Sequence, residues 1–474
     1  TRIIQWREIE ESALDSALQL LYMQRIDIET APLVFHFFHY ADNQYIFVIR
    51  HHHILLDGWS NAIFLREILQ YYEAAVKREL VPVPNKGSYK DYLIACQNTM
   101  NNQAAIEYWK RQLNGYSHFI QSHTEGDGFQ LPLVEKIELH KDTQNKIQTF
   151  IQTNEMTLAG FFFTVWGLWL QMHYHRSDVV FGTVTSGRNI HVQGIENIVG
   201  MFSLTVPFRF QTGSKDRNQI ILNVKKQLTE RDAYVFVSPA ELERFLNQKE
   251  LFNTIVVIEN YPIIRDKWSD KLEMAGIDVI ESTHYDLTFA VDINESYFLR
   301  LIQNPEATEF DLKRIGYQIE QIIQTLLTKE ILQICDTSVE PQAAEASPII
   351  TEVNETRMAL PKEYQKPNNE IYGRLIDAVK RIIQPLEFNP TVSLFQNGID
   401  SIKTMHINFA IYKTFGINLE LKKLFEAENF FSLAVLIETQ MNEQSQGMNQ
   451  TAIPSKMTKT SAVPASRQQK RIYF

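Results

Sequence analysis

Hydrophobic positions recur at helical spacing in two stretches near the start of the chain, Glu10–Met23 and Ser60–Lys77. Between them, Leu33–Phe38 and Tyr45–Ile49 are rich in aromatic and β-branched residues and predict two strands. The polar residues that separate these strands predict a turn, and therefore a hairpin. The second helix opens on a serine, a residue type favoured at N-caps, so Ser60 is predicted to be its N-cap.

A second region, from about residue 88 to 335, alternates predicted helices and strands without an internal repeat. Its most apolar stretch, Leu158–Leu170, is shorter than the roughly 20 residues that cross a bilayer, so we expect a buried helix. This alternation predicts a mixed α/β layer architecture. The strands expected here are Val179–Thr185, Thr205–Phe210, Ile255–Ile258 and Leu287–Val291.

The composition changes after Cys335, where residues 336–363 are polar and turn-prone and are typical of a linker. A small helical unit is predicted over residues 364–443, followed by a second linker over 444–465. The helices expected in this unit are Glu370–Ile383, Ser401–Thr414 and Ser432–Met441.

The overall composition and charge of the chain argue against several classes of protein. The 474 residues are 44% hydrophobic and 22% charged, which is typical of globular protein rather than disordered chain. The net charge of −10 argues against a nucleic-acid surface. Cys96 and Cys335 are too few for a disulfide framework or thiolate metal site and fit a reducing cytosol. The first residues show no basic stretch followed by an apolar run, so no signal peptide is expected.

The most distinctive chemistry lies at the end of the second predicted strand, where Arg50 precedes three histidines, among them His52 and His53. Histidine is the side chain best suited to accept or donate a proton near neutral pH. Asp57 would orient the loop by pairing with an arginine, and Gly58 permits a backbone turn that other residues resist. Alone, this pattern is also compatible with a purely structural loop.

Three adjacent histidines also raise the question of a metal site. Successive strand residues point to opposite faces, so at most two of the three side chains would converge. No further His or Glu follows at helical spacing to complete a ligand set. A metal is therefore not expected.

The stretch RHHHILLDGWS resembles the HHxxxDG signature of condensation domains of nonribosomal peptide synthetases, which share the fold of the chloramphenicol acetyltransferase superfamily. Five further segments resemble the family in the same order, which makes the motif specific. These segments are DIETAPLVF (27–35), EYWKRQL (107–113), VVFGTVTSGRN (179–189), NIVGMFSLTVPFR (197–209) and LFNTIVVIENYP (251–262).

The resemblance implies a two-lobed domain, with a partial first lobe over residues 1–90 and a second lobe over 91–335. It makes His53 the catalytic histidine, His52 its mostly structural neighbour and Asp57 the residue that holds the loop, beside Gly58. Arg188 of the SGR segment is the candidate partner of Asp57. His53 would deprotonate the attacking amine, stabilise a charged intermediate or position the nucleophile, and the sequence leaves these open.

Three details refine the resemblance. The DGWS pattern is similar to domains that join L-configured partners rather than to epimerisation domains. Such domains ordinarily begin further upstream, so the sheet of the first lobe is expected to be incomplete. Leu204 stands where asparagine is usual in the family segment FxNTLPxR, which argues against full activity.

A second constellation is GIDSIK (398–403), in which Ser401 opens an apolar-periodic helix. By itself this serine is more often an N-cap. A GxSxG hydrolase elbow does not fit, because the second glycine is missing. The segment closely resembles the attachment motif of peptidyl carrier domains, which are small four-helix units. The resemblance makes Ser401 the carrier of 4′-phosphopantetheine, added by a separate phosphopantetheinyl transferase.

Residues 351–357 resemble the entrance to an adenylation domain and residues 360–370 the exit from one, yet they lie almost side by side. The resemblance therefore implies that an adenylation domain acts in trans or that the module passes a chain along. Ser466–Phe474 resembles the start of a next condensation domain. The implied partners are thus an upstream carrier domain and a downstream condensation domain, without nucleic acid or membrane.

The leading hypothesis is amide formation between a carrier-bound thioester and a carrier-bound amine, in the cytoplasm. One alternative is acyl transfer to a free amine or alcohol. The other is a non-elongating platform that docks carriers, which Leu204 and the missing adenylation domain motivate. The intact histidine motif favours a catalyst over the platform.

Overall fold

The computed structural model describes most of residues 4–116 and 131–330 and part of 369–446. The gaps within these stretches are 81–86, 101–102, 191, 213–215, 238, 248–249, 260–271, 274, 282, 294–296, 308–309, 381–388, 393, 395–396, 398–400, 418, 420–422, 425–426 and 428. The predicted linkers, the resemblances at 351–368 and the resemblance at 466–474 lie outside the described residues.

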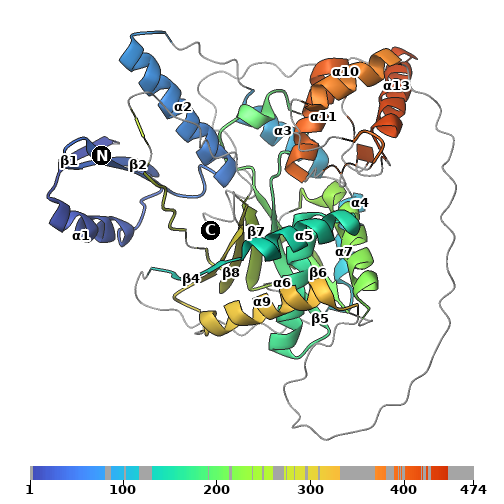
Figure 1. Cartoon of the computed structure of the whole chain (residues 1–474), viewed down its shortest axis with the longest axis horizontal. Coiled ribbons are helices and arrows are strands. Elements are labelled where there is room, and N and C mark those ends of the chain that lie inside the picture. Colours follow the sequence, from blue (N-terminus) through green and yellow to red (C-terminus); the bar gives the residue numbers. More distant parts are fainter. Residues whose placement is uncertain are drawn as a thin grey trace, which may run out of the picture.

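The N-terminal region is a three-stranded sheet with one helix packed on it (Figure 1). The predicted hairpin is confirmed as antiparallel strands β2 (Leu33–Ala41) and β3 (Gln44–His51). Strand β1 (Ile4–Glu8), which the periodicity did not predict, pairs in parallel with β2. The predicted first helix is confirmed as α1 (Glu11–Tyr22), which covers the face of the sheet that carries Phe38.

A six-stranded mixed sheet forms the centre of the second region, in the order β4-β9-β8-β7-β5-β6. The four predicted strands are confirmed, whereas β4 and β9 were not predicted. Strands β5, β7 and β8 run parallel, so their carboxyl ends lie at one edge of the sheet. The strands are β4 (Leu133–Glu138), β5 (Asp178–Thr185), β6 (Leu204–Gln211), β7 (Thr254–Glu259), β8 (Leu287–Ile293) and β9 (Tyr297–Gln303).

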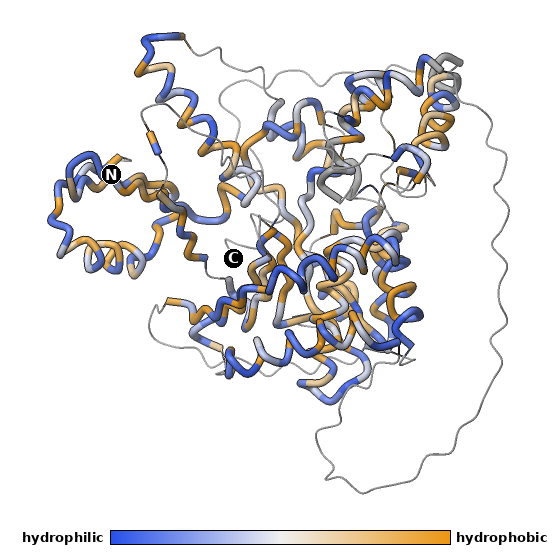
Figure 2. Tube along the Cα trace, in the orientation of Figure 1, coloured by the Kyte–Doolittle hydropathy of each residue, from blue (hydrophilic) through white to orange (hydrophobic). Residues whose placement is uncertain are grey.

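One face of this sheet is covered by the largest hydrophobic core of the described chain. At its centre is α6 (Leu158–Tyr174), which confirms the predicted buried helix. Gly167 allows α6 to approach β6 closely, because a Cβ there would lie 2.4 Å from the Phe210 ring. The helices beside it are α5 (Lys141–Thr153), α7 (Arg217–Arg231) and α9 (Leu312–Thr328). Figure 2 shows hydrophobic residues along the strands of the sheet, and hydrophobic and hydrophilic residues alternating along these helices.

The opposite face carries a second core over β5, β6 and β7. It is built with α4 (Gln103–Leu113) and α8 (Pro239–Leu246). Helix α3 (Tyr89–Met100) packs instead against the segment around Phe202. Helix α2 (Gly58–Lys77) follows the N-terminal sheet, and its first turn contacts the same segment. The two regions therefore meet where α2 begins.

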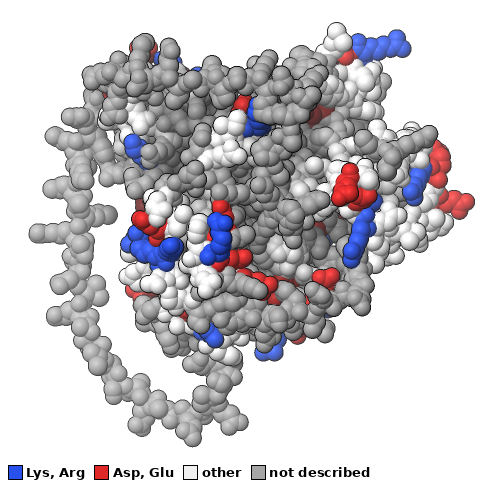
Figure 3. Space-filling model, turned by 180° about the vertical axis from the view of Figure 1, so that it is seen from behind, with Lys and Arg blue, Asp and Glu red and all other residues white. Residues whose placement is uncertain are grey.

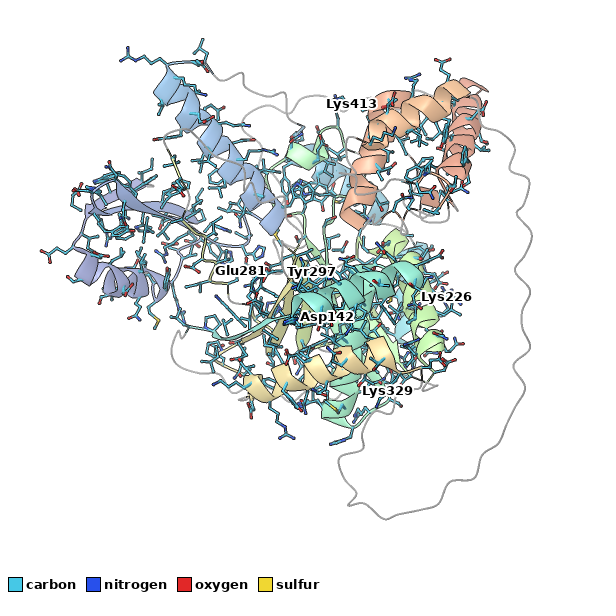
Figure 4. All side chains as sticks on the ribbon, in the orientation of Figure 1. Asp142, Lys226, Glu281, Tyr297, Lys329 and Lys413 are labelled. Atoms are coloured by element: carbon cyan, nitrogen blue, oxygen red, sulfur yellow. The ribbon has the colours of Figure 1, made fainter. Side chains whose placement is uncertain are left out.

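The described part of the C-terminal unit is helical and has its own hydrophobic core. The three predicted helices are confirmed as α10 (Asn369–Lys380), α11 (Ser401–Phe415) and α13 (Phe430–Gln446). Gly416, which follows α11, has a φ of 73° and its N–H donates to the Tyr412 carbonyl, an arrangement typical of a helix C-terminus. Lys413 in Figure 4 marks α11.

Charged side chains of both signs are interspersed on the face of the molecule seen in Figure 3. An example is the Lys146–Asp142 pair on α5, whose Nζ–Oδ2 distance is 2.6 Å; Figure 4 labels Asp142. Within the described residues, every helix is too short or too polar to cross a membrane.

Candidate functional site

The histidine motif lies on a tight turn between β3 and α2. Strand β3 ends at His51, and the N–H of His52 donates to the Pro32 carbonyl at 2.9 Å. The N–H of Leu55 then donates back to the His52 carbonyl at 3.1 Å, which closes the turn. The motif is therefore presented on a turn that the sheet and α2 hold at both ends.

The two neighbouring histidines of the motif differ in their surroundings. Nδ1 of His52 accepts a hydrogen bond from the N–H of Ile54 at 3.2 Å. Burial lowers the pKa of His52, and the neighbouring His53 adds to this effect. The His53 side chain is exposed, and it makes no hydrogen bond with the part of the chain that the structure describes. The His52 side chain thus stabilises the turn, while the His53 side chain is accessible to another molecule.

Asp57 is almost fully buried, with 1% of its surface exposed. Its Oδ1 accepts from the N–H of Ser60 at 2.8 Å, which caps α2. Its Oδ2 accepts from the N–H groups of Phe202 at 3.0 Å and Ser203 at 3.1 Å. One carboxylate therefore starts α2 and also fastens it to a segment far along the chain.

Two predictions for this helix start are wrong. Ser60 is not the N-cap, because α2 already begins at Gly58 and the carboxylate of Asp57 provides the cap. Gly58 does not supply an unusual turn either, because it is the first helical residue and is not among the glycines with positive φ. The glycine that the geometry requires is Gly187, whose φ is 61° and whose Cβ would lie 1.9 Å from the Phe202 carbonyl oxygen.

The structure brings Arg188 next to Asp57, with 3.5 Å between Nη2 and Oδ1. That distance is longer than the roughly 2.7–2.9 Å of a strong charge-assisted hydrogen bond. Nη1 of Arg188 donates to the Ile198 carbonyl at a shorter distance of 3.0 Å, and the guanidinium lies over the Phe202 ring, 3.7 Å from its centre. Because Arg188 is only 2% exposed, these contacts offset part of the cost of burying its charge, while its Nε has no hydrogen-bond partner among the described residues.

Two residues of this junction were not singled out as functional from the sequence. The hydroxyl of Ser60 bonds Arg188 and the backbone of Gly200. The indole N–H of Trp59 donates to the Glu196 carbonyl at 3.0 Å. Their partners lie more than a hundred residues away, so no local pattern could have revealed them. Leu204, the departure from the family pattern, begins β6 and packs against the second core.

Ser401 is the first residue of α11, as predicted. The first N–H groups of a helix lack intrahelical partners, and the helix dipole favours negative charge there. The helix is held in place by Thr404, Ile407 and Ile411, which are fully buried. This position fits a phosphodiester on Ser401. The neighbouring Gly398 and Asp400 lie outside the described residues.

Across the described residues, no group of three His, Cys, Asp or Glu side chains is placed to hold a metal ion. Of the motif histidines, His51 ends the strand, Nδ1 of His52 accepts from the Ile54 N–H, and His53 is exposed.

Comparisons with known proteins match the two motifs separately. Residues 1–342 match the family model of the condensation domain, and residues 373–435 match that of the phosphopantetheine attachment site. Bacitracin synthase 3 of Bacillus licheniformis is 28% identical over 334 residues, which are 68% of this chain and 5% of that protein. Tyrocidine synthase 3 of Brevibacillus parabrevis is 29% identical over 341 residues, 69% of this chain and 5% of that protein.

Solved structures support the fold. The first condensation domain of the CDA synthetase has a TM-score of 0.59 at 14% identity, over 70% of this chain and 77% of that one. The condensation domain from the Monacolin K polyketide synthase MokA has a TM-score of 0.57 at 14% identity, over 70% and 81%. The predicted fold class is thus confirmed. This chain spans only a small part of bacitracin synthase 3 and tyrocidine synthase 3, so their activities are not transferred to it.

Proposed function

Because the chain belongs to the condensation-domain family and carries a phosphopantetheine attachment site, we propose that it acts in nonribosomal peptide synthesis. The reaction we propose joins a carrier-bound thioester to a carrier-bound amine. The single observation that carries this proposal is the exposed His53 on a turn whose base is fixed by the buried Asp57. Such rigidity suits a group that must meet a reacting amine in one geometry.

The proposed chemistry needs no metal or nucleotide, because a thioester is already activated. The amine nitrogen forms a bond to the thioester carbon, the carbon–sulfur bond breaks, and the proton lost by the amine ends on the leaving sulfur, which departs as a thiol. The part we propose for His53 is to contact the amine and to position it or take its proton. His52, with its lowered pKa, stays neutral and holds the turn. Asp57 and Arg188 are proposed to keep the turn aligned with the second lobe.

For the carrier unit we propose Ser401 as the attachment residue. The phosphopantetheine group, when attached, supplies a flexible arm whose thiol holds an acyl group as a thioester. The chain's own contribution is the start of α11, because a helix N-terminus favours the negative charge of a phosphodiester bonded to the serine oxygen. A phosphopantetheinyl transferase, an upstream carrier domain, an adenylation domain in trans and a downstream condensation domain are the partners we propose.

This proposal divides the chain into lobes over 1–90 and 91–335 and a carrier unit over 364–443. The order and approximate extent of the two family matches support it. The DGWS pattern supports L-configured partners as the finer assignment. A non-elongating platform is the second candidate, and the apolar Leu204 in place of asparagine favours it.

Attachment is tested by intact-protein mass spectrometry after incubation with coenzyme A and a broad-specificity phosphopantetheinyl transferase. We expect a mass gain of one phosphopantetheine in the wild type and none in Ser401→Ala. Ser12→Ala, an exposed serine on α1, should keep the gain. A gain that persists in Ser401→Ala would assign the group to another residue.

Catalysis is tested by His53→Ala in the natural full-length synthetase, with product measured by mass spectrometry. We expect product formation to fall by about a hundredfold or more, the range in which proton transfer and positioning contribute. His140→Ala, at an exposed histidine before α5, is the matched control and should leave the product yield unchanged. Unchanged yield in His53→Ala would favour the platform.

A further inference from the structure

The side chain of Ser60 is completely buried in the first turn of α2, at the junction of the two regions. Its hydroxyl donates to the Gly200 carbonyl at 2.7 Å. It accepts from the Gly200 N–H at 3.0 Å and from Nη2 of Arg188 at 2.9 Å. A hydroxyl can donate one hydrogen bond and accept two, so the Ser60 hydroxyl makes all the hydrogen bonds that it can make.

The partner segment has little freedom to move. A Cβ on Gly200 would lie 2.5 Å from the Tyr89 ring, so the backbone of Gly200 is pressed against that side chain. The Gly200 carbonyl also accepts from the N–H of Asp57 at 3.3 Å. The first turn of α2 is thus bonded to both backbone groups of one tightly packed glycine.

We propose that Ser60 is a positioning residue for the condensation reaction. Its hydroxyl fixes the start of α2, and with it the turn that carries His53, on the segment that contains Gly200 and Phe202. The inference rests on the proposed function, because His53 is the group that Ser60 positions. The inference goes beyond the proposed function because it assigns the alignment of the His53 turn to a hydroxyl outside the HHxxxDG motif.

Removing this hydroxyl takes a hydrogen-bond acceptor from two buried groups. The N–H of Gly200 and one N–H of Arg188 would both lose an acceptor, and no water-accessible surface is at hand because Ser60 is 0% exposed. The local backbone then relaxes, and the turn moves with it. A displacement of about 1 Å at a reacting group is enough to lower a rate by roughly a hundredfold.

The test compares three substitutions at position 60 in the full chain. Ser60→Ala removes the hydroxyl without adding volume. Ser60→Thr and Ser60→Val form a matched pair of nearly equal shape, of which only Ser60→Thr retains a hydroxyl. Thr164→Val is the control for loss of a buried hydroxyl elsewhere, because Thr164 is 1% exposed and, among the described residues, its hydroxyl donates to the Gly160 carbonyl within α6.

The first readout is independent of turnover. In chain labelled with ¹³C and ¹⁵N histidine, the His53 ring signals, assigned with His53→Gln, report the environment of the turn. We expect them to shift in Ser60→Ala and Ser60→Val, to stay closer to wild type in Ser60→Thr and to be unchanged in Thr164→Val. Identical spectra for Ser60→Thr and Ser60→Val would overturn the role of the hydroxyl.

The second readout is the condensation rate in the natural synthetase. We expect kcat for Ser60→Val to lie about tenfold or more below that for Ser60→Thr, with KM for the loaded carrier unchanged and Ser401 loading intact. Equal kcat values in a wild-type background that turns over would refute the proposal. If His53→Ala also leaves the rate unchanged, the proposed function itself fails, and the ring signals alone then decide whether Ser60 holds the turn.

Discussion

The N-terminal sheet and the six-stranded sheet are stabilised in different ways. The six-stranded sheet is packed on both faces, and side chains such as Phe289, Trp166 and Phe208 are completely buried. The N-terminal sheet has a small core beneath α1, while Trp6 and Tyr45 on β1 and β3 remain 57% and 52% exposed. The other face is only partly covered, where Phe64 of α2 stacks on Phe35. Small sheets of this kind have little apolar burial to offset the loss of chain entropy.

The difference between the two sheets indicates the role of the polar junction, which consists of Asp57, Ser60 and Arg188. These three residues are all 2% exposed or less, although each is polar or charged. Their bonds tie the start of α2 to the well-packed region, so the weaker N-terminal region gains order from the stronger one. The proposed catalytic turn thus belongs to the region with less core and depends on a junction made of hydrogen bonds.

The largest effect is expected in the core of the six-stranded sheet. Phe289 stacks on Trp166, with 4.9 Å between ring centres, and Phe289→Ala should lower the free energy of unfolding by about 3–5 kcal/mol. Denaturant unfolding followed by circular dichroism measures it. Tyr317→Ala, on the exposed side of α9, is the control and should change stability by less than about 0.5 kcal/mol. Equal effects of the two substitutions would contradict the comparison.

A somewhat smaller loss of stability is expected for a substitution at the junction. This loss should be concentrated in the N-terminal sheet and α2. Arg188→Ala leaves the buried Asp57 without its cation and should cost about 3 kcal/mol. Hydrogen exchange should then rise in β2, β3 and α2 more than in the six-stranded sheet. Arg209→Ala breaks the ion pair with Asp178, 2.7 Å long, within the second region and serves as the matched control.

If Arg209→Ala raises exchange in the N-terminal sheet as much as Arg188→Ala does, the junction has no special role. If Arg188→Ala raises exchange uniformly over the whole chain, the two regions unfold as one unit. Either result would remove the distinction between the two sheets.

The smallest effect is a pH dependence of the N-terminal sheet. His36 on β2 is 1% exposed, and neither ring nitrogen has a hydrogen-bond partner among the described residues. Burial, with added repulsion from Arg50 and Arg7, lowers the pKa of His36 to about 4. The unfolded chain therefore binds the proton first as pH falls, and the stability present at neutral pH is lost between about 6.5 and 4.

Between pH 7 and pH 5 this loss amounts to about 2 kcal/mol, and hydrogen exchange of residues 33–51 should report it. His36→Leu removes the titrating group, so its exchange in this segment should depend less on pH over the same range. A wild-type N-terminal sheet whose exchange is no more sensitive to pH than that of His36→Leu would show that His36 does not titrate as described.

Local patterns predicted the two sheets' principal strands well. The hairpin of β2 and β3 and the strands β5 to β8 follow from runs of aromatic and β-branched residues, and α6 from an apolar stretch too short for a membrane. For two of the strands that were not predicted, β1 and β4, there is a physical reason. β1 is short and mostly exposed, with a weak hydrophobic signal, and β4 mixes apolar and charged residues because it lies at a sheet edge.

The candidate site was predictable where its residues are neighbours in sequence. The histidine motif and the serine at the start of α11 each lie within one short segment, so motif resemblance sufficed to select His53 and Ser401. It also proposed Arg188 beside Asp57, because both belong to family segments. The role of Ser60 was mistaken, because a serine in the first turn of a helix looks like a cap whichever carboxylate provides it.

The sequence by itself determined the element types, the order of the two functional motifs and the residues they contain, because these depend on periodicity and on short contiguous segments. Tertiary structure alone decided how far His53 and His52 differ in exposure, which oxygen caps α2 and which groups the Ser60 hydroxyl joins. The reason is that burial and hydrogen bonding depend on partners such as Gly200 and Phe202, which are far from Asp57 in the sequence and lie beside it only in the folded structure.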